Sequence, residues 1–297
     1  MKKAIWAGLS SILISTSAMA ANSACPTLAM PLATALKQAV NQEKAADPDG
    51  VIGFGLNMWA TVVAPDGRVC EVAYSGATAI QGQWLASRVI SAQKAFTAVS
   101  LSLSSGNPFG FAISSANLYT ATQPGGSLFG LQHSNPVAPA NAYGDKINSA
   151  GANVGPTDTG LYGTPKDPMV GQVIGGINVF GGGLALYQSA SNKVGGVGVS
   201  GDTSCADHMV AWRLRRLIGL DKLSGVGGPT GDSSFPDNII FDTAFNVNSN
   251  TTVPSGTLNN VGPYTSAGGW GHPTCKGATN AQANAIKGNT PLLPPVQ

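Results

Sequence analysis

Apolar residues recur at helical spacing in two segments of the chain. Between residues 84 and 103 they step by three or four positions: Leu85, Val89, Ala92, Phe96, Val99 and Leu103. This spacing predicts a helix with one buried face. It leaves four polar side chains away from the centre of that face, namely Arg88, Ser91, Lys94 and Thr97. A weaker repeat predicts another helix over residues 28–46.

Strand-like segments are separated by strong turn residues. Residues 54–64 and 69–74 flank Pro65-Asp66-Gly67-Arg68, where proline presets φ and glycine accepts positive φ, so the two segments should form a hairpin. Three further segments have strand character: residues 172–180, 184–188 and 194–200. A third helix should then begin at Asp202 or Thr203 and run to about residue 218. Its Ser204 and Asp207 have the spacing of a capping box.

Two long segments lack a regular pattern. Residues 105–170 are rich in turn-forming residues, which predicts a long loop insertion with short elements inside it. Residues 221–297 carry few charges but five aromatic residues. We therefore expect this C-terminal extension to pack on the body of the protein, with residues 237–243 as an added strand. A wholly disordered tail is the alternative.

The composition is that of a weakly charged globular protein. Only 10% of the 297 residues are charged, against roughly 25% in an ordinary domain. The hydrophobic content of 43% and the net charge of +2 exclude an intrinsically disordered chain. The 39 glycines do not recur at every third position, which excludes a collagen.

The first 20 residues have the pattern of a secretory signal peptide. Lys2 and Lys3 precede an apolar run over residues 4–17, and Ala18-Met19-Ala20 supplies a cleavage site after Ala20. The run is shorter than the roughly 20 residues of a membrane span. Cleavage removes two of the 16 basic residues and no acidic one, which leaves 14 of each. We expect a periplasmic or secreted protein with no membrane attachment after cleavage and no nucleic-acid partner.

All four cysteines lie in the mature chain. An even number in an oxidising compartment suggests two disulfides. Three pairings are open, of which we favour Cys25–Cys70 and Cys205–Cys275. No C-x-x-C pair and no histidine at ligand spacing supports a metal site.

No motif identifies a catalytic residue. Residues 196–201 match G-x-G-x-x-G, but Asp221 follows a helix and does not end a strand, as a dinucleotide site requires. The glycines are better explained by the close approach of another backbone or of a flat ligand. Lys94 could meet a carboxylate or a propionate, or extend into solvent along its apolar stem.

Four segments, in order, resemble the GlcG/HbpS-like haem-binding family (DUF336-type). They are the hairpin at residues 62–67, Lys94-Ala95-Phe96-Thr97-Ala98-Val99-Ser100, the segment 181–186 and the strand 194–201. The glycines of these motifs are Gly182, Gly183, Gly196, Gly198 and Gly201, and an acidic residue, Asp207, follows in the next helix. Ala185 stands where the family has proline. The resemblance covers about residues 28–105 and 170–220.

The resemblance implies an α+β fold, a profilin-like antiparallel sheet flanked by helices, within residues 21–220. It also implies a homo-oligomer and a ligand that is haem or a similar planar molecule. Haem needs an apolar slot, a cation for its propionates and an axial ligand. The candidate haem-binding residues are Lys94, Thr97, Arg88, His133, His208 and Tyr119, with His133 as the first choice of axial ligand.

We therefore expect an exported haem-binding protein that serves haem capture, storage or sensing. One alternative is an enzyme that acts on haem or on a small organic acid. Another is a non-catalytic oligomeric interaction module. A Soret band on adding hemin separates the first function from the last.

Overall fold

A four-stranded antiparallel sheet forms the centre of this computed structural model. Its strands are β1 (Trp59–Val63), β2 (Val69–Tyr74), β5 (Gly183–Ser189) and β6 (Asn192–Ser200), in the order β2-β1-β6-β5. The structure describes residues 23–79, 83–104, 110–147, 153–156, 158–190, 192–245, 264–266, 268–276, 278–279 and 281–282. The predicted signal peptide lies outside the described residues.

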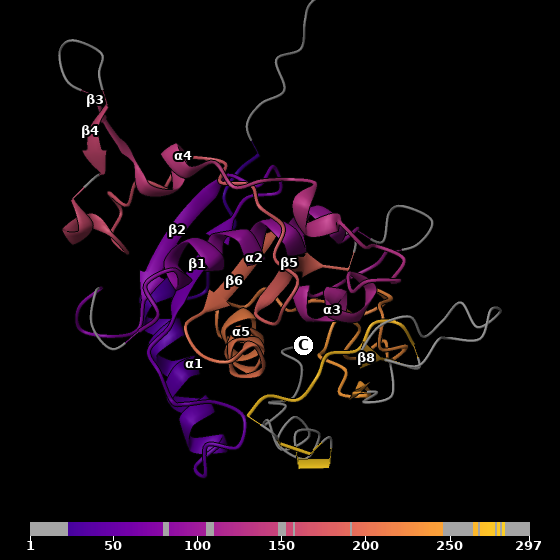
Figure 1. Cartoon of the computed structure of the whole chain (residues 1–297). Helices are drawn as coiled ribbons and strands as arrows, with labels where there is room; N and C mark the ends of the chain where they lie inside the picture. Colours follow the sequence, from indigo (N-terminus) through magenta and orange to yellow (C-terminus); the bar gives the residue numbers. More distant parts are fainter. Residues whose placement is uncertain are drawn as a thin grey trace, which may run out of the picture.

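Helices cover both faces of this sheet (Figure 1). Helix α2 (Ser87–Leu101) packs on one face, against Trp59 and Val63 of β1. Helices α1 (Leu32–Ala46) and α5 (Ser204–Leu217) pack on the other, where Ala60 and Val62 join their core. Alternate residues of one strand therefore serve two cores, as the period of a strand requires. The α+β prediction is confirmed.

The turn and disulfide predictions are also confirmed. Strands β1 and β2 form a hairpin in which Gly67 has φ +83° and its N–H donates to the Ala64 carbonyl. The disulfides join Cys25 to Cys70 and Cys205 to Cys275. The first ties the N-terminal segment to β2, and the second ties the C-terminal extension to the start of α5.

The start of α5 differs from the predicted capping box. The Thr203 side chain caps the helix by accepting a hydrogen bond from the Ala206 N–H. The predicted Ser204–Asp207 capping box is wrong, because the Asp207 carboxylate accepts a hydrogen bond from the Asp202 N–H and pairs with the buried ammonium of Lys94. This tertiary ion pair replaces the local capping contact.

Residues 172–180 do not form the predicted strand. They make only single bridges, Arg68 to Val173 and Val137 to Gly175. Gly175 and Gly176 have φ of +70° and +81°, which interrupts an extended chain. The segment instead lies along the outer side of α2, where the Asn178 N–H donates to Thr97. The segment therefore covers a side of α2 that the apolar spacing predicted to face solvent.

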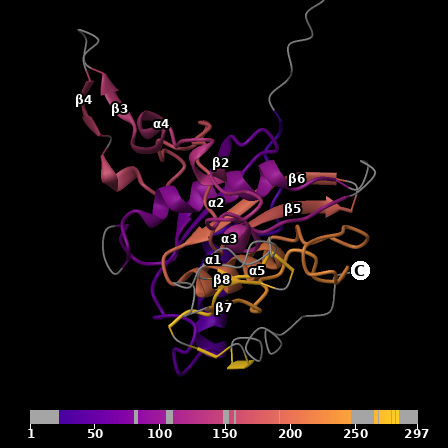
Figure 2. The same ribbon diagram turned by 45° about the vertical axis from the view of Figure 1, so that its right-hand side comes forward.

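The segment 105–170 contains only short elements among its described residues. These are η1 (Ser115–Asn117), α3 (Leu118–Ala121), η2 (Leu131–His133), α4 (Pro139–Tyr143), β3 (Asp145–Ile147), β4 (Asn153–Pro156) and η3 (Thr159–Leu161). The β3–β4 hairpin stands away from the central sheet in both ribbon views (Figures 1 and 2).

The C-terminal extension contributes to the main core. Ile239 and Phe241 are buried in the cluster formed by α1 and α5. Residues 237–243 stay irregular, and the strand begins just after them, with β7 (Ala244–Phe245) paired to β8 (Tyr264–Thr265). This displaces the predicted strand toward the C-terminus.

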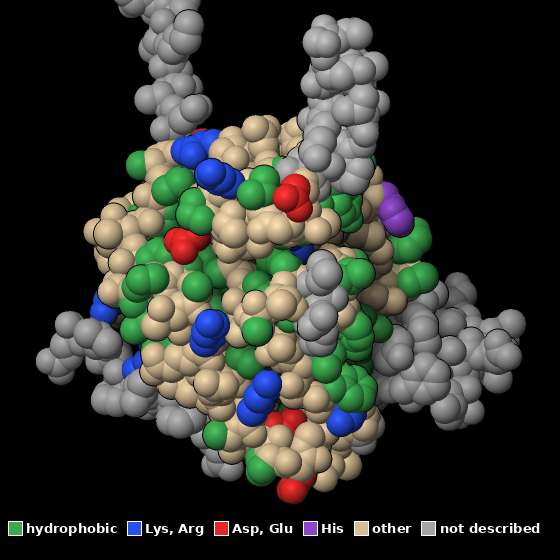
Figure 3. Space-filling view, turned by 90° about the vertical axis from the view of Figure 1, so that its left-hand side faces the viewer, with side chains coloured by type: hydrophobic (Ala, Val, Ile, Leu, Met, Phe, Trp, Pro, Cys, Tyr) green, Lys and Arg blue, Asp and Glu red, His purple; other side chains and the backbone are tan. Residues whose placement is uncertain are grey.

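The surface reflects the low charge of the chain. On the face shown in Figure 3, basic and acidic side chains lie singly among uncharged and apolar groups. Across the described residues, no helix has the length and hydrophobicity to cross a membrane.

Candidate functional site

The motif glycines let α2 lie directly on the sheet. A Cβ atom added at Gly198 would lie 1.9 Å from the Ser91 carbonyl oxygen, and one at Gly196 would lie 2.5 Å from the Ala95 carbonyl oxygen. A Cβ at Gly183 would lie 2.4 Å from the Lys94 carbonyl oxygen. Because these contacts exclude any side chain, the approaching group is the backbone of α2 and not a flat ligand.

The other two motif glycines carry the chain around Lys94 and the end of β6. A Cβ at Gly182 would lie 2.2 Å from the Val199 carbonyl oxygen and 3.1 Å from the Lys94 Nζ. A Cβ at Gly201 would lie 2.5 Å from the Asn57 carbonyl oxygen. Gly182 therefore leaves room for the Lys94 ammonium, and Gly201 lets the end of β6 lie against the loop before β1.

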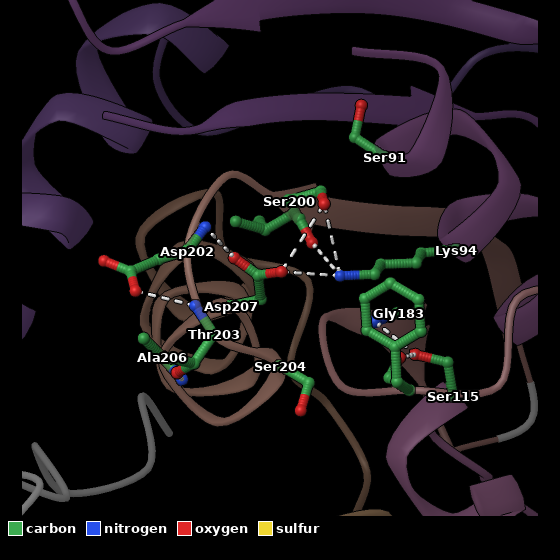
Figure 4. Close-up of polar contacts among 12 residues, drawn as sticks. Ser91, Lys94, Ser115, Gly183, Ser200, Asp202, Thr203, Ser204, Ala206 and Asp207 are labelled. Carbon is green, nitrogen blue, oxygen red and sulfur yellow. Dashed lines mark hydrogen bonds and ion pairs between the residues drawn. The ribbon is translucent and has the colours of Figure 1, made fainter. Parts of the chain in front are cut away.

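Lys94 is the centre of a buried polar network (Figure 4). Its Nζ donates to Asp207 Oδ2 at 2.7 Å, to the Val199 carbonyl at 3.1 Å and to Ser200 Oγ at 3.4 Å. The same ammonium lies 4.2 Å from the centre of the Phe180 ring. Both Lys94 and Asp207 are 0% exposed. The ion pair joins α2 to α5 across the end of β6.

Burial dominates the electrostatics of this pair. Desolvation raises the pKa of Asp207 to about 6, against the opposing effect of Lys94, and it lowers the pKa of Lys94. A buried ion pair is stable only when its remaining hydrogen-bonding groups are satisfied. Here the Val199 carbonyl and Ser200 satisfy the ammonium, and the Asp202 N–H satisfies Asp207 Oδ1 at 2.9 Å.

Asp202 extends the network to the loop before β1. Its carboxylate accepts hydrogen bonds from the N–H groups of Phe54 and Leu56 at 2.8–3.0 Å. Its own N–H donates to Asp207. Two adjacent acidic groups thus face different directions, with Asp207 toward the interior and Asp202 toward the loop.

A serine and a histidine meet beside this network. Ser204 Oγ lies 3.0 Å from His272 Nε2, and His272 Nδ1 lies 2.6 Å from the Pro273 carbonyl oxygen. The distance is that of a nucleophile and a base. However, His272 is 1% exposed, and burial lowers its pKa to about 4, which makes it a weak base. The contact between Ser204 and His272 is best explained as a structural link between the C-terminal extension and α5.

Arg88, the second residue of α2, has a similar buried environment. Its guanidinium donates to both oxygens of Asp167 and to the Ala142 carbonyl, and it stacks 3.8 Å from the centre of the Tyr162 ring. Arg88 is 2% exposed. The prediction that Arg88, Ser91, Lys94 and Thr97 lie off the buried face is wrong. The insertion and residues 172–180 cover Arg88 and Thr97, whereas Ser91 and Lys94 face the sheet, toward Thr61 and the Val199 carbonyl.

The remaining candidates lie apart from one another. Thr97 is buried and bonds the Gln93 carbonyl and the Asn178 N–H. His208 is buried on α5, where its Nε2 accepts from the Ile239 N–H. Half-buried Tyr119 lies with its ring centre 5.1 Å from that of His272. His133 is the exposed histidine. The structure does not gather the six candidates into one slot.

The sequence pattern missed several partners in these networks. Asp167, Ser200 and Asp202 carry no local signal, because each acts on a residue from a different element. The sequence marked Asp207 as an acidic residue that follows the glycine-rich strand, but it did not indicate the pairing of Asp207 with Lys94. Within the described residues, no group of three or more His, Cys, Asp and Glu side chains could hold a metal ion.

The fold and the network define an α+β protein with an antiparallel sheet, two covered faces and a buried lysine–aspartate pair. No family model and no curated protein matches the chain. Among solved structures, it is similar to the DUF336 protein ORFY of Klebsiella pneumoniae, with 19% identity and a TM-score of 0.36 over 67% of this chain and 96% of that one.

Two further solved structures are similar to the chain. The PduOC–haem complex has 18% identity and a TM-score of 0.37 over 63% of this chain and 94% of that one. A double mutant of HbpS from Streptomyces reticuli has 16% identity and a TM-score of 0.34 over 71% and 99%. The DUF336 and HbpS names agree with the family that the motifs resemble.

Proposed function

We propose that this chain is an exported haem-binding protein that holds haem on its surface at His133. The support is the resemblance of four motifs to a haem-binding family, together with one structural observation. His133 is exposed at the end of η2, four residues after Phe129, whose side chain is 65% exposed. An imidazole and an aromatic ring on one surface loop are suited to ligate iron and to cover part of a porphyrin.

The interior does not fit haem. Lys94 and Arg88 already have buried carboxylate partners, Asp207 and Asp167. His208 is buried and accepts a backbone hydrogen bond. Moving any of these groups to a porphyrin would leave a buried charge or polar group unpaired. His133 is therefore the proposed haem ligand, whereas Lys94, Arg88 and His208 stabilise the fold through their buried contacts.

The loop that presents His133 is internally hydrogen-bonded. The Leu128 N–H donates to the Ala121 carbonyl, and the His133 N–H donates to the Gly130 carbonyl. Gly130 has φ +91°, which permits the tight turn before η2. A surface haem has one face left open, and a second copy of the chain would cover it. The proposed protein is therefore a homo-oligomer when loaded, and the two disulfides fit an exported protein.

A hemin titration of the purified chain tests this proposal. Wild type should show a saturable Soret shift at micromolar hemin. His133→Ala should lose the shift or move its maximum, whereas Ser134→Ala, the exposed neighbour, should behave as wild type. No saturable shift in wild type would end the proposal, and an unchanged spectrum in His133→Ala would remove the proposed ligand. N-terminal sequencing of exported protein should begin at Ala21.

A further inference from the structure

A cavity of about 380 Å³ lies between the end of α1, the loop over residues 47–56 and the start of α5. Apolar side chains form part of its wall: Val40, Phe54, Leu56 and Met58. Four carboxyl groups also line it, Glu43, Asp47, Asp49 and Asp202, against two lysines, Lys44 and Lys276. The cavity combines an apolar wall with an excess of acidic groups.

Two carboxylates fix the backbone of the loop. Asp47 accepts hydrogen bonds from the N–H groups of residues 51–53 at 2.7–2.9 Å. Asp202 accepts from the N–H groups of Phe54 and Leu56. Because the N–H groups point toward these carboxylates, carbonyl groups of the loop are available on the opposite side as acceptors.

Lys276 uses those acceptors. Its Nζ donates to the Gly50 carbonyl at 2.5 Å and to the Gly53 carbonyl at 3.0 Å, and it lies 4.4 Å from the centre of the Phe54 ring. Two carbonyls and an aromatic face are the partners that an alkylammonium group prefers. Phe54 nevertheless stays 58% exposed, so the ring is open to a second occupant.

Glu43 is the acidic group of the cavity that is incompletely compensated, although Arg213 pairs with its Oε2. Burial raises the pKa of Glu43 to about 7, and the charges of Asp47 and Asp202 add to the effect, against the opposing charge of Arg213. Glu43 Oε1 is buried and has no hydrogen-bond partner among the described residues. A positive ligand in this cavity would lower the repulsion among these carboxyl groups.

We propose that this cavity binds a small primary alkylammonium ligand, and that Lys276 is a tethered competitor in its cation subsite. The two carbonyl acceptors require N–H donors, which a primary ammonium has and a quaternary one lacks. Lys276 is held there by its neighbour Cys275, through the disulfide to Cys205. Its backbone has φ +52°, an unfavourable conformation for a lysine that the surrounding contacts maintain.

Isothermal titration of the full, disulfide-bonded chain with n-butylammonium chloride tests this site at constant ionic strength and without haem. This probe has the length and charge of a lysine side chain. Wild type should bind it saturably at one site. Lys276→Ala should bind it at least about tenfold tighter, because the Lys276 ammonium no longer occupies the cation subsite and most molecules then have this subsite free. Phe54→Ala combined with Lys276→Ala should lose most of this gain.

Lys37 supplies the control, because it is an exposed lysine of the same helix, α1, and lies outside the cavity wall. Lys37→Ala should bind as wild type does. Absence of saturable binding in wild type overturns the site, and equal affinity in wild type and Lys276→Ala overturns the competitor. Equal binding of tetramethylammonium overturns the primary-ammonium preference. Failure here does not affect the haem proposal, since His133 takes no part in the measurement.

Discussion

Replacing Lys94 with methionine should lower the free energy of unfolding by about 3–5 kcal/mol at pH 8. The change keeps a long side chain but removes the ammonium that faces Asp207 at 2.7 Å. Both side chains are fully buried. The Asp207 carboxylate is then left in the interior with the Asp202 N–H and Ser200 as its partners.

The loss should depend on pH in a defined direction. Burial already raises the pKa of Asp207 from 3.8 to about 6, and Lys94 is the main effect that opposes this rise. Without Lys94 the pKa of folded Asp207 rises further above its unfolded value. Wild type itself loses stability between about pH 4 and pH 6 as Asp207 ionises. The additional loss in Lys94→Met therefore begins near pH 6 and grows by about 1.4 kcal/mol per pH unit until the pH passes the folded pKa of Asp207 in the variant. Lys94→Met should be closer to wild type at pH 5 than at pH 8.

Urea unfolding under non-reducing conditions at pH 5 and pH 8, followed by tryptophan fluorescence and circular dichroism, measures this loss. Lys166→Met is the matched control, because Lys166 is exposed and should change stability by under about 0.5 kcal/mol. The double variant Lys94→Met with Asp207→Asn should recover part of the loss, since no buried charge remains. A loss below about 1 kcal/mol at pH 8, or a double variant whose loss equals the sum of the single losses, would refute the reasoning.

Three further outcomes follow from the packing, the histidine and the disulfides. Gly198→Ala should cost at least about 1–3 kcal/mol, because its Cβ would overlap the Ser91 carbonyl, whereas Gly268→Ala has open space and should be neutral in the same unfolding assay. His272, with a pKa lowered from 6.5 to about 4, stabilises the fold above pH 6.5. That stability, about 3 kcal/mol, is lost as the pH falls through 6.5 toward 4, and His272→Gln should unfold with a flatter pH dependence. Thiol counting on denatured protein should find no free thiols, and reduction of the Cys25–Cys70 bridge, with a sequence separation of 45, should cost up to about 4 kcal/mol.

The glycine-rich motifs were interpreted only in part from the sequence. Their glycines correctly indicated that another group lies in close contact with the strand over residues 194–200. It left open whether that group is a backbone or a flat ligand, because a missing Cβ is the same signal for both. The structure decides for the backbone of α2, whose Ser91 and Ala95 carbonyls touch Gly198 and Gly196. The wall that the glycines form is therefore inside the fold.

The candidate site was less predictable than the elements. Lys94 and Asp207 each belong to a segment that resembles the family, but the sequence does not predict that they pair, because the ion pair joins two separate helices. Arg88 gave no hint of Asp167, which lies in the irregular insertion. Helical spacing marks one buried face, but it contains no information on whether a distant segment will cover the other face. The burial of Arg88 and Thr97 was missed for that reason, whereas Lys94 faces the sheet and is buried against the Val199 carbonyl and Asp207.

The sequence by itself determined the elements whose cause is local. The hairpin at Pro65-Asp66-Gly67-Arg68 follows from backbone sterics, and the main helices follow from apolar spacing. The cysteine count and an expected oxidising compartment made two disulfides a sound expectation. Tertiary structure alone decided which polar groups are buried and paired. Long-range contacts set the local dielectric, and the dielectric decides whether a lysine such as Lys94 or Lys276 is a solvated side chain, half of an ion pair or the occupant of a ligand site.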